Sequence, residues 1–322
     1  MILPNHMKKE IIVDAALVGE RFDKVMTQLL DSHTRSQLQM LIKQGQITIN
    51  EKIHTPHYAL KEGDRIQIHD EPIVPDEIHD MPPLEILAET PDYIVVNKPS
   101  GVIVHPSKIH PQHDTLIDAV IAQYPEVKKV GDDPSRPGII HRLDKDASGV
   151  MVIARTQDSF EDLKRQFKTR TVYKEYLIVA YGDVQPEEGT INAPIARSVR
   201  HHTKFAAKSN DSGKEAITEY WTIASSPQFS FIRVHPLTGR THQIRVHFHS
   251  KGNSLVGDAI YRLKKGKLVA SARLMLHARQ LSFTDLNGEK QDYTCLPDAL
   301  FLSILYGLLP QTKALDIGSS LS

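Results

Sequence analysis

A short polar segment between two apolar runs has the residue types for acid, base or nucleophilic chemistry. Residues 138–156 read GIIHRLDKDASGVMVIART, and the polar side chains in the middle are His141, Arg142, Asp144, Lys145 and Asp146. Carboxylates can attack carbon or take up protons. Because a charged turn between two buried strands is a favourable place for a site, this segment is the first candidate for an active site.

The same segment can also be interpreted without any chemistry, as a surface turn. In that interpretation Asp146 and Ser148 bond to the local backbone, as such residues often do in turns. This accounts for those two residues and leaves the rest of the segment unexplained. We therefore favour the active-site interpretation.

Two other groups of residues suggest a metal site or a nucleotide site. The chain has 17 histidines, and His242 and His249 would share one face of a helix while His247 points elsewhere. Arg245 lies between them, and a cation among ligands argues against a metal. The run KPSG at residues 98–101 lacks the spacing of a nucleotide-binding P-loop. We expect neither a metal nor a cofactor.

The elements that must position the polar segment follow from the spacing of apolar residues. Strands are predicted at Tyr93–Asn97, Val150–Ala154, Tyr173–Ala180, Ala216–Ile223, Phe229–His235 and Leu274–Phe283. Helices are predicted at Thr115–Gln123, Ser159–Lys168, Thr241–Ser250 and Ala299–Leu309. Because strands and helices do not alternate, the fold class is α+β with a mixed sheet rather than a doubly wound parallel one.

Residues 19–72 predict a second, smaller α/β domain. A helix at Asp23–Leu30 precedes another that Thr34 or Ser36 could cap and that Gly45 would stop. The strands expected after it are Ile47–Asn50 and Arg65–His69. This domain would be joined to the larger one by a linker rich in proline and acidic residues.

The composition and the apolar runs divide the chain into four parts. Residues 19–72 form the smaller domain, 73–86 the linker, 87–311 the larger domain and 312–322 a flexible tail. No run predicts a membrane span or a secretory leader, so we expect a cytoplasmic protein, a monomer by default. The single cysteine, Cys295, excludes an intramolecular disulfide and a cysteine metal cage. Lys plus Arg and Asp plus Glu both number 39, so any binding of nucleic acid must come from local patches.

Four motifs of the larger domain resemble those of the RluA family of pseudouridine synthases. HRLDKDASG looks like the family's active-site signature. YIVVNKPSGVIVHPS at 93–107, TRTVYKEYLIVAYG at 169–182 and LTGRTHQIRVH at 237–247 are similar to its first motif, its base-stacking strand and its arginine motif. Residues 19–72 resemble the ribosomal-protein-S4-like RNA-binding domain. This combination resembles most the RluD branch, which acts on large-subunit ribosomal RNA.

The resemblance implies an enzyme that detaches uracil from ribose at N1, rotates the base and rejoins it through C5. It implies that Asp144 is the reactive carboxylate, by attack on C1′ or by removal of the C2′ proton. Burial raises the pKa of a carboxylate and a guanidinium lowers it, so the carboxylate needs an arginine partner. The arginine motif supplies Arg245. By the same resemblance Tyr176 stacks on the uracil, and Arg142 fills the gap that the flipped base leaves.

The resemblance further implies phosphate contacts in both domains. These are Arg35 and Lys43 in the smaller domain, and Arg170, Lys174 and Arg240 in the larger one. Basic runs at 164–174 and 197–208 would add to them, with a contribution that falls with salt. Taken alone, each such charge is as well explained by a solvated surface. The partner expected is large-subunit ribosomal RNA, free or in pre-ribosomal particles.

Two positions depart from the family's pattern, and one rival function stays open. Ala147 stands where a small hydroxyl residue is usual, and no glycine follows Tyr261, which leaves the next loop undefined. The rival function is an RNA-binding ribosome assembly factor with little or no catalysis. Binding alone does not need a carboxylate that faces a polyanion, so the presence of Asp144 within its motif favours an enzyme.

Overall fold

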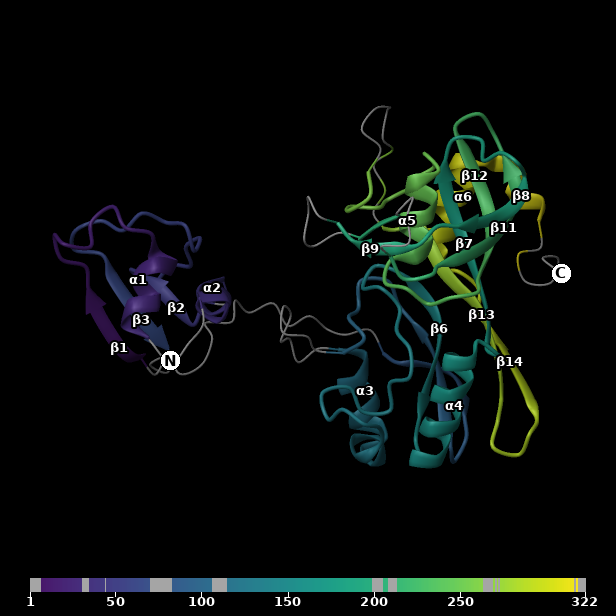
Figure 1. The fold of residues 1–322 in the computed structure, drawn as a ribbon, viewed down its shortest axis with the longest axis horizontal. Helices are drawn as coiled ribbons and strands as arrows, with labels where there is room; N and C mark the ends of the chain where they lie inside the picture. Colours follow the sequence, from purple (N-terminus) through teal and green to yellow (C-terminus); the bar gives the residue numbers. More distant parts are fainter. Residues whose placement is uncertain are drawn as a thin grey trace. The chain divides into compact units, whose positions relative to one another are not determined.

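The computed structural model describes residues 7–30, 35–43, 45–69, 83–105, 115–198, 205–207, 213–262, 269, 271, 273–315 and 317. The chain divides into two compact units, Met1–Asp80 and Met81–Ser322, whose elements are labelled in Figure 1. Within the described ranges, no helix is both long and apolar enough to cross a membrane. Each unit has a hydrophobic core of its own.

The smaller unit is a three-stranded antiparallel sheet with two helices. Its elements are β1 (Met7–Ile12), α1 (Phe22–Leu29), α2 (Arg35–Lys43), β2 (Ile47–Ile49) and β3 (Arg65–His69), and the strand order is β1-β3-β2. Phe22 and Met26 of α1 pack on Leu38 and Ile42 of α2 in a core with no exposed surface. Both helices predicted in this part of the chain are therefore present, and their apolar faces form the core of the smaller unit.

Three details of the smaller unit differ from the sequence-based expectation or lie beyond it. Strand β1 lies before residue 19, so the unit begins earlier than predicted. Ser36 lies inside α2, which starts at Arg35, and so cannot cap it; Thr34 lies outside the described residues. Gly45 follows α2 with a φ of 75° and does stop the helix as predicted.

The larger unit is built on one long mixed sheet. Its strands are β4 (Glu85–Glu89), β5 (Tyr93–Lys98), β6 (Ser148–Ala154), β7 (Tyr173–Tyr181), β8 (Glu188–Asn192), β11 (Ile217–Ser225), β12 (Phe229–Pro236), β13 (Leu276–Thr284) and β14 (Lys290–Thr294). The order is β4-β5-β6-β13-β7-β12-β11-β8, with β14 on β13, and β6 and β13 are parallel. A separate pair joins β9 (Ile195–Arg197) to β10 (Phe205–Ala207). The mixed-sheet α+β prediction is confirmed.

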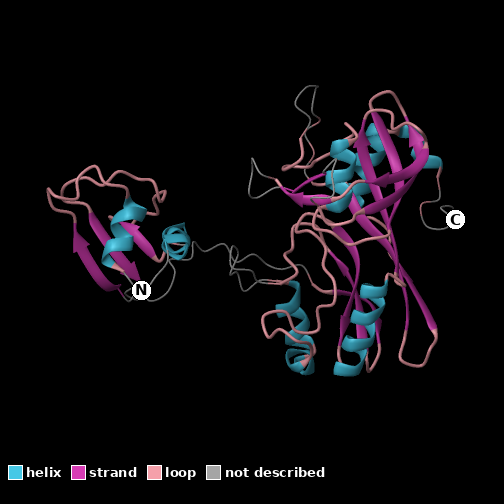
Figure 2. Ribbon diagram, viewed as in Figure 1, coloured by secondary structure: helices cyan, strands magenta, loops and turns pink. Residues whose placement is uncertain are grey.

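Helices cover both faces of this sheet, as Figures 1 and 2 show. They are α3 (Leu116–Gln123), α4 (Gln157–Thr169), α5 (Gln243–Ser250) and α6 (Ala299–Leu308), with two 3-10 turns at Pro125–Lys129 and Pro310–Ala314. Because side chains alternate along a strand, Met151 of β6 faces the core of α3 and α5, while Val152 faces α4. Helix α6 packs on Leu177 of β7 and Phe231 of β12.

Two described residues beyond residue 311 are buried, which corrects the prediction of a flexible tail for them. Thr312 has no exposed surface and Ile317 is buried against the core of α6. The prediction of a flexible tail is therefore wrong for these residues. The divisions at 19–72, 73–86 and 87–311 otherwise stay predictions, and most of the linker lies outside the described residues.

Candidate active site

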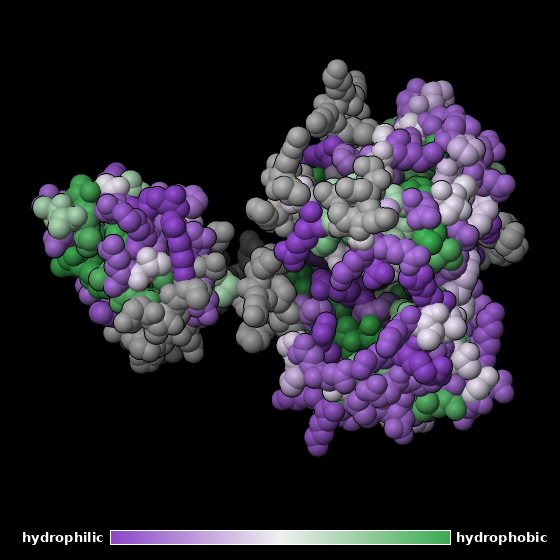
Figure 3. Space-filling model, viewed as in Figure 1, coloured by the Kyte–Doolittle hydropathy of each residue, from purple (hydrophilic) through white to green (hydrophobic). Residues whose placement is uncertain are grey.

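The larger unit contains a cavity of about 550 Å³ lined by three separate segments of the chain. The lining residues come from 140–147, from 167–176 and from 236–245, together with Leu276. In Figure 3 the drawn face of this unit is mostly hydrophilic, and some hydrophobic residues gather in a hollow across its middle. The polar segment, the base-stacking strand and the arginine motif of the sequence therefore meet at one place.

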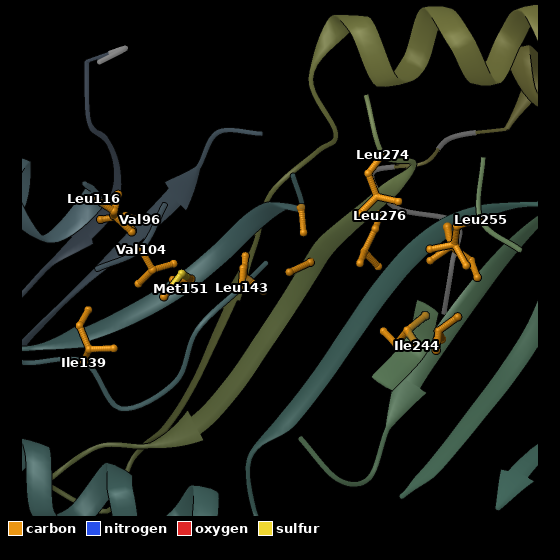
Figure 4. Close-up of a cluster of buried hydrophobic side chains, with 14 of the residues drawn as sticks. Val96, Val104, Leu116, Ile139, Leu143, Met151, Ile244, Leu255, Leu274 and Leu276 are labelled. Atoms are coloured by element: carbon orange, nitrogen blue, oxygen red, sulfur yellow. The ribbon is translucent and has the colours of Figure 1, made fainter. Parts of the chain in front are cut away.

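Asp144 lies in the turn that leads into β6, with neighbours that anchor it. Leu143 is buried in the same hydrophobic cluster as Met151 and as Ile244 of α5, as Figure 4 shows. The backbone N–H of Ala147 donates to the Asp144 carbonyl at 3.2 Å. The Asp144 side chain itself keeps 20% of its surface exposed. The carboxylate thus lies at the cavity wall, on a turn that is anchored by the buried Leu143 and by a backbone hydrogen bond.

Residues 98–101 (KPSG) hold the turn that follows Asp144 through hydrogen bonds to its backbone carbonyls. The Lys98 ammonium has no exposed surface and donates to three carbonyl oxygens, among them that of Lys145 at 3.0 Å. The Ser100 hydroxyl donates to the Asp146 carbonyl at 2.7 Å. Burial lowers the pKa of Lys98 to about 7. Sequence reasoning missed this role because the turn that Lys98 holds is distant along the chain.

Arg245 forms the ion pair with Asp144 that the sequence predicted. Its Nη1 donates to Asp144 Oδ2 at 2.8 Å, and its side chain is only 3% exposed. Its Nε and Nη2 donate to both oxygens of Asp258, at 2.7 and 2.9 Å. Burial alone would lower the pKa of Arg245, but the two carboxylates, Asp258 foremost, raise it. The guanidinium therefore stays charged between them.

Asp258 is a site residue that sequence reasoning missed. It also accepts the backbone N–H groups of Ile260 and Tyr261, at 2.8 and 2.9 Å. Burial acts to raise the pKa of Asp258, but the hydrogen bonds from Arg245 outweigh burial and lower it. Asp258 stands in the sequence GDAIYRL at residues 257–263. This is the segment that departs from the family's pattern because no glycine follows Tyr261. The loop beyond Arg262 lies outside the described residues up to 268.

Tyr176 and Arg142 both line the cavity, as predicted from their motifs. Tyr176 is half-buried in β7, and burial together with the nearby Asp144 charge raises the pKa of its phenol. Arg142 is exposed, with its Nη1 3.1 Å from Nε2 of His105. An aromatic ring and an exposed guanidinium thus lie in the same cavity as the Asp144 carboxylate.

The three histidines considered as metal ligands do not converge. His247 is buried and bonds Thr218 and the Ala193 carbonyl, while His249 bonds Ser254. His242 alone lines the cavity, with its Nε2 3.8 Å from Asp144 Oδ1. Among the residues that the structure describes, no group of acidic, histidine or cysteine side chains is arranged to hold a metal ion.

The predicted phosphate contacts divide into those at the cavity and those elsewhere. Arg170, Lys174 and Arg240 line the cavity. Arg170 pairs with the Glu215 carboxylate, and Arg240 Nε donates to the Glu215 carbonyl at 2.9 Å. Burial, and then the charge of Arg170, lowers the pKa of Lys174 to about 8. Glu215 thus bonds two of the three cations, Arg170 through its carboxylate and Arg240 through its backbone carbonyl.

Lys168 of the first basic run also lines the cavity, whereas Lys164 and Arg165 of that run are engaged elsewhere. Lys164 pairs with Asp132 and Arg165 with Asp162 on α4, so these two are solvated ion pairs rather than cavity residues. Residues 199–204 and 208 of the second run lie outside the described residues.

In the smaller unit, Arg35 and Arg21 both bond the buried carboxylate of Asp23. Gln39 donates to the same carboxylate at 2.5 Å. Arg35 remains 52% exposed, so part of its guanidinium faces solvent. Lys43 ends α2, and its side chain is not among those described.

Ser148 does not bond the local backbone as the surface-turn interpretation expected. Its hydroxyl lies 2.8 Å from Nδ1 of His277 and accepts a hydrogen bond from Arg273 at 2.7 Å. These partners come from the far end of the chain, on or beside β13. The polar segment is therefore tied into the sheet by long-range contacts, unlike a simple surface turn.

Comparison with known proteins shows the family to which this chain belongs. The family of RNA pseudouridylate synthases matches residues 92–250, and the S4 domain matches residues 20–66. An uncharacterized RNA pseudouridine synthase of Aquifex aeolicus is 37% identical over 81% of this chain and 84% of its own. This chain is an RNA pseudouridine synthase of the RluA family.

Other relatives of this synthase agree with that assignment. The ribosomal large subunit pseudouridine synthase D of Nitrosomonas europaea is 36% identical over 85% of this chain and 80% of its own. Among solved structures, human RNA pseudouridylate synthase domain containing 1 is similar with a TM-score of 0.55 at 27% identity. That match covers 70% of this synthase and 86% of the human chain. The predicted family and enzyme class are confirmed.

Proposed function

We propose that this synthase converts uridine to pseudouridine in large-subunit ribosomal RNA and that Asp144 is its reactive carboxylate. The observation that supports this most is the carboxylate at the cavity wall, 2.8 Å from a buried arginine and in the same cavity as Tyr176. The names of relatives such as the Nitrosomonas europaea enzyme support the choice of ribosomal RNA.

The proposed reaction balances without a cofactor. The C1′–N1 bond of uridine breaks and a C1′–C5 bond forms, while a proton leaves C5 and one is taken up at N1. Asp144, kept ionised by Arg245, attacks C1′ or removes the C2′ proton. Tyr176 holds the free base by stacking, since a detached uracil must turn without leaving. Arg142 occupies the space that the flipped nucleotide leaves in the RNA helix.

Cations of both units would bind the RNA backbone. We assign phosphate contacts to Arg170, Lys174 and Arg240 around the cavity, and to Arg35 and Lys43 in the smaller unit. We propose that the enzyme acts in the cytoplasm as a monomer, on free ribosomal RNA or on pre-ribosomal particles. The rival function, an assembly factor without catalysis, predicts binding of the same RNA with no product.

The test compares two carboxylates that lie two residues apart. Asp144→Asn should abolish pseudouridine formation in a large-subunit ribosomal RNA transcript and keep RNA affinity within a few-fold, because the amide keeps the shape and loses the charge. Asp146→Asn is the matched control, since Asp146 does not line the cavity, and should retain activity. Full activity of Asp144→Asn would refute the assignment.

The substrate is tested by a separate measurement. Pseudouridines mapped in ribosomal RNA from cells with and without this gene should differ at one or a few uridines of the large subunit. An identical map in both cells, together with tight binding of the RNA by the protein, would support the assembly factor instead.

A further inference from the structure

The two oxygens of the Asp144 carboxylate have different neighbours. Oδ2 accepts the hydrogen bond from Arg245, whereas Oδ1 faces Nε2 of His242 at 3.8 Å. That distance is too long for a direct hydrogen bond. It is short enough for one oxygen atom to bond both groups at once. Since both side chains keep some exposure, 20% for Asp144 and 17% for His242, a ligand in the cavity can reach this gap.

A hydrogen-bond chain fixes which nitrogen of His242 faces the cavity with a proton. The Tyr261 hydroxyl accepts the backbone N–H of Phe205 at 3.0 Å and lies 2.9 Å from His242 Nδ1. Since the hydroxyl already accepts from Phe205, it has its own proton left to donate, and His242 Nδ1 lies in position to accept it. Nδ1 therefore accepts, and burial, which lowers the pKa of His242, keeps the ring neutral. The single ring proton is then on Nε2, beside Asp144.

One turn of the backbone holds both side chains that border the carboxylate. Asp258 bonds Arg245 and the N–H of Tyr261, and Tyr261 in turn bonds His242. His242 itself has a φ of 57°, an uncommon conformation for a residue other than glycine, which aims its ring from the start of α5. Such a restrained donor is typical of a binding group.

The bridging group must both accept and donate a hydrogen bond. It accepts from His242 Nε2–H and donates to Asp144 Oδ1, which a carbonyl oxygen of uracil cannot do. Asp144 acts at C1′ or C2′ of the sugar, so the group lies on that sugar. Inside an RNA strand the 3′ and 5′ oxygens are esterified, and the 2′-hydroxyl is the one sugar group that can do both.

We infer that His242 and Asp144 together bind the 2′-hydroxyl of the target nucleotide, so that His242 makes the enzyme select a ribonucleotide at this position. This inference rests on the proposed function. It assigns His242 to substrate recognition, whereas the spacing of the histidines had only suggested a metal ligand.

The test measures single-turnover pseudouridine formation in an RNA fragment that contains the mapped target as uridine or as 2′-deoxyuridine. His242→Asn removes the ring and keeps a residue that tolerates a positive φ. With uridine, its rate should fall about fivefold to tenfold, the effect of one hydrogen bond. Its preference for uridine over 2′-deoxyuridine should fall by the same factor. His249→Asn, the same change later on α5 and outside the cavity, should keep the wild-type preference.

Tyr261→Phe provides an independent variant that leaves the ring of His242 in place. Without the hydroxyl the proton can move to Nδ1, so the uridine preference should again fall. A wild-type preference in both variants would overturn this inference alone, because a purely structural role slows both substrates equally. A wild-type enzyme that makes no product with uridine would overturn the proposed function and this inference with it.

Discussion

At the scale of single residues, the position of the Asp144 carboxylate depends on Arg245, and Arg245 depends on Asp258. Asp258→Asn removes one of the two charges that hold the buried guanidinium. We expect a loss of about 1.5 to 3 kcal/mol in the free energy of unfolding, as for other hydrogen bonds to charged groups, and a slower single-turnover rate at saturating RNA. Thermal unfolding and the rate are compared with the exposed control Asp183→Asn, which should change neither. Wild-type values for Asp258→Asn would contradict the role of Asp258.

Two substitutions of Tyr176 distinguish a stacking role of its ring from simple packing in β7. Tyr176→Leu keeps an apolar side chain in β7 but removes the ring, so we expect the turnover rate to fall about tenfold or more, since stacking on a base is worth about 1 to 3 kcal/mol. Tyr176→Phe keeps the ring and should retain most of that activity. Circular dichroism confirms that both variants are folded, and equal kinetics for Leu and wild type would remove the stacking role.

The sequence predicted site residues that stand within short motifs and missed those whose partners are distant along the chain. Asp144 stands in a short polar segment between apolar runs, and Arg245 stands in a segment that resembles the arginine motif of the family. Asp258 follows Arg245 by 13 residues across a turn, and such a separation has no periodicity to reveal it. Lys98 bonds a carbonyl 47 residues away. Its contribution is therefore visible only after the chain has folded.

At the scale of elements, prediction succeeded for strands with a buried face. The predicted strands at Tyr93, Val150 and Phe229 start within two residues of β5, β6 and β12. Strands β8 and β14 were missed because each alternates exposed and half-buried positions without an apolar run. Edge strands are specified by their partner rather than by their own residues, so a single sequence reports them poorly.

The contact between β6 and β13 gives the larger unit a pH dependence. His277 of β13 is buried and neutral, between Ser148 and the Cys295 carbonyl, and burial lowers its pKa to about 4. The unfolded chain binds a proton below about pH 6.5 and the folded one only below about 4. Stability should therefore decrease as the pH falls through this window, by up to about 1.4 kcal/mol per pH unit for this group. Urea unfolding from pH 7 to 5 measures it, and His277→Gln should have a smaller slope; an unchanged slope would exclude His277 as the cause.

At the scale of the whole molecule, the smaller unit should contribute affinity rather than chemistry. Arg35 is oriented by the buried carboxylate of Asp23, and about half of its side chain is exposed. Arg35→Gln should weaken RNA binding and lower the slope of log affinity against log salt by about 1, the effect of one lost phosphate contact. The single-turnover rate at saturating RNA should not change. Lys9→Gln, an exposed cation on β1, is the control, and an equal effect of both variants would indicate a nonspecific charge effect.

The parallel pairing of β6 with β13 also has a consequence for the order in which the molecule forms. Ser148 and His277, which meet there, are 129 residues apart, whereas the strands of the smaller unit pair over much shorter loops. Contacts between distant segments form late, and domains made first on the ribosome fold first. A growing chain therefore completes its first RNA-binding unit early. In the larger unit, the turn that carries Asp144 obtains the contacts of Ser148 with Arg273 and His277 only after β13 has been synthesised and has joined the sheet.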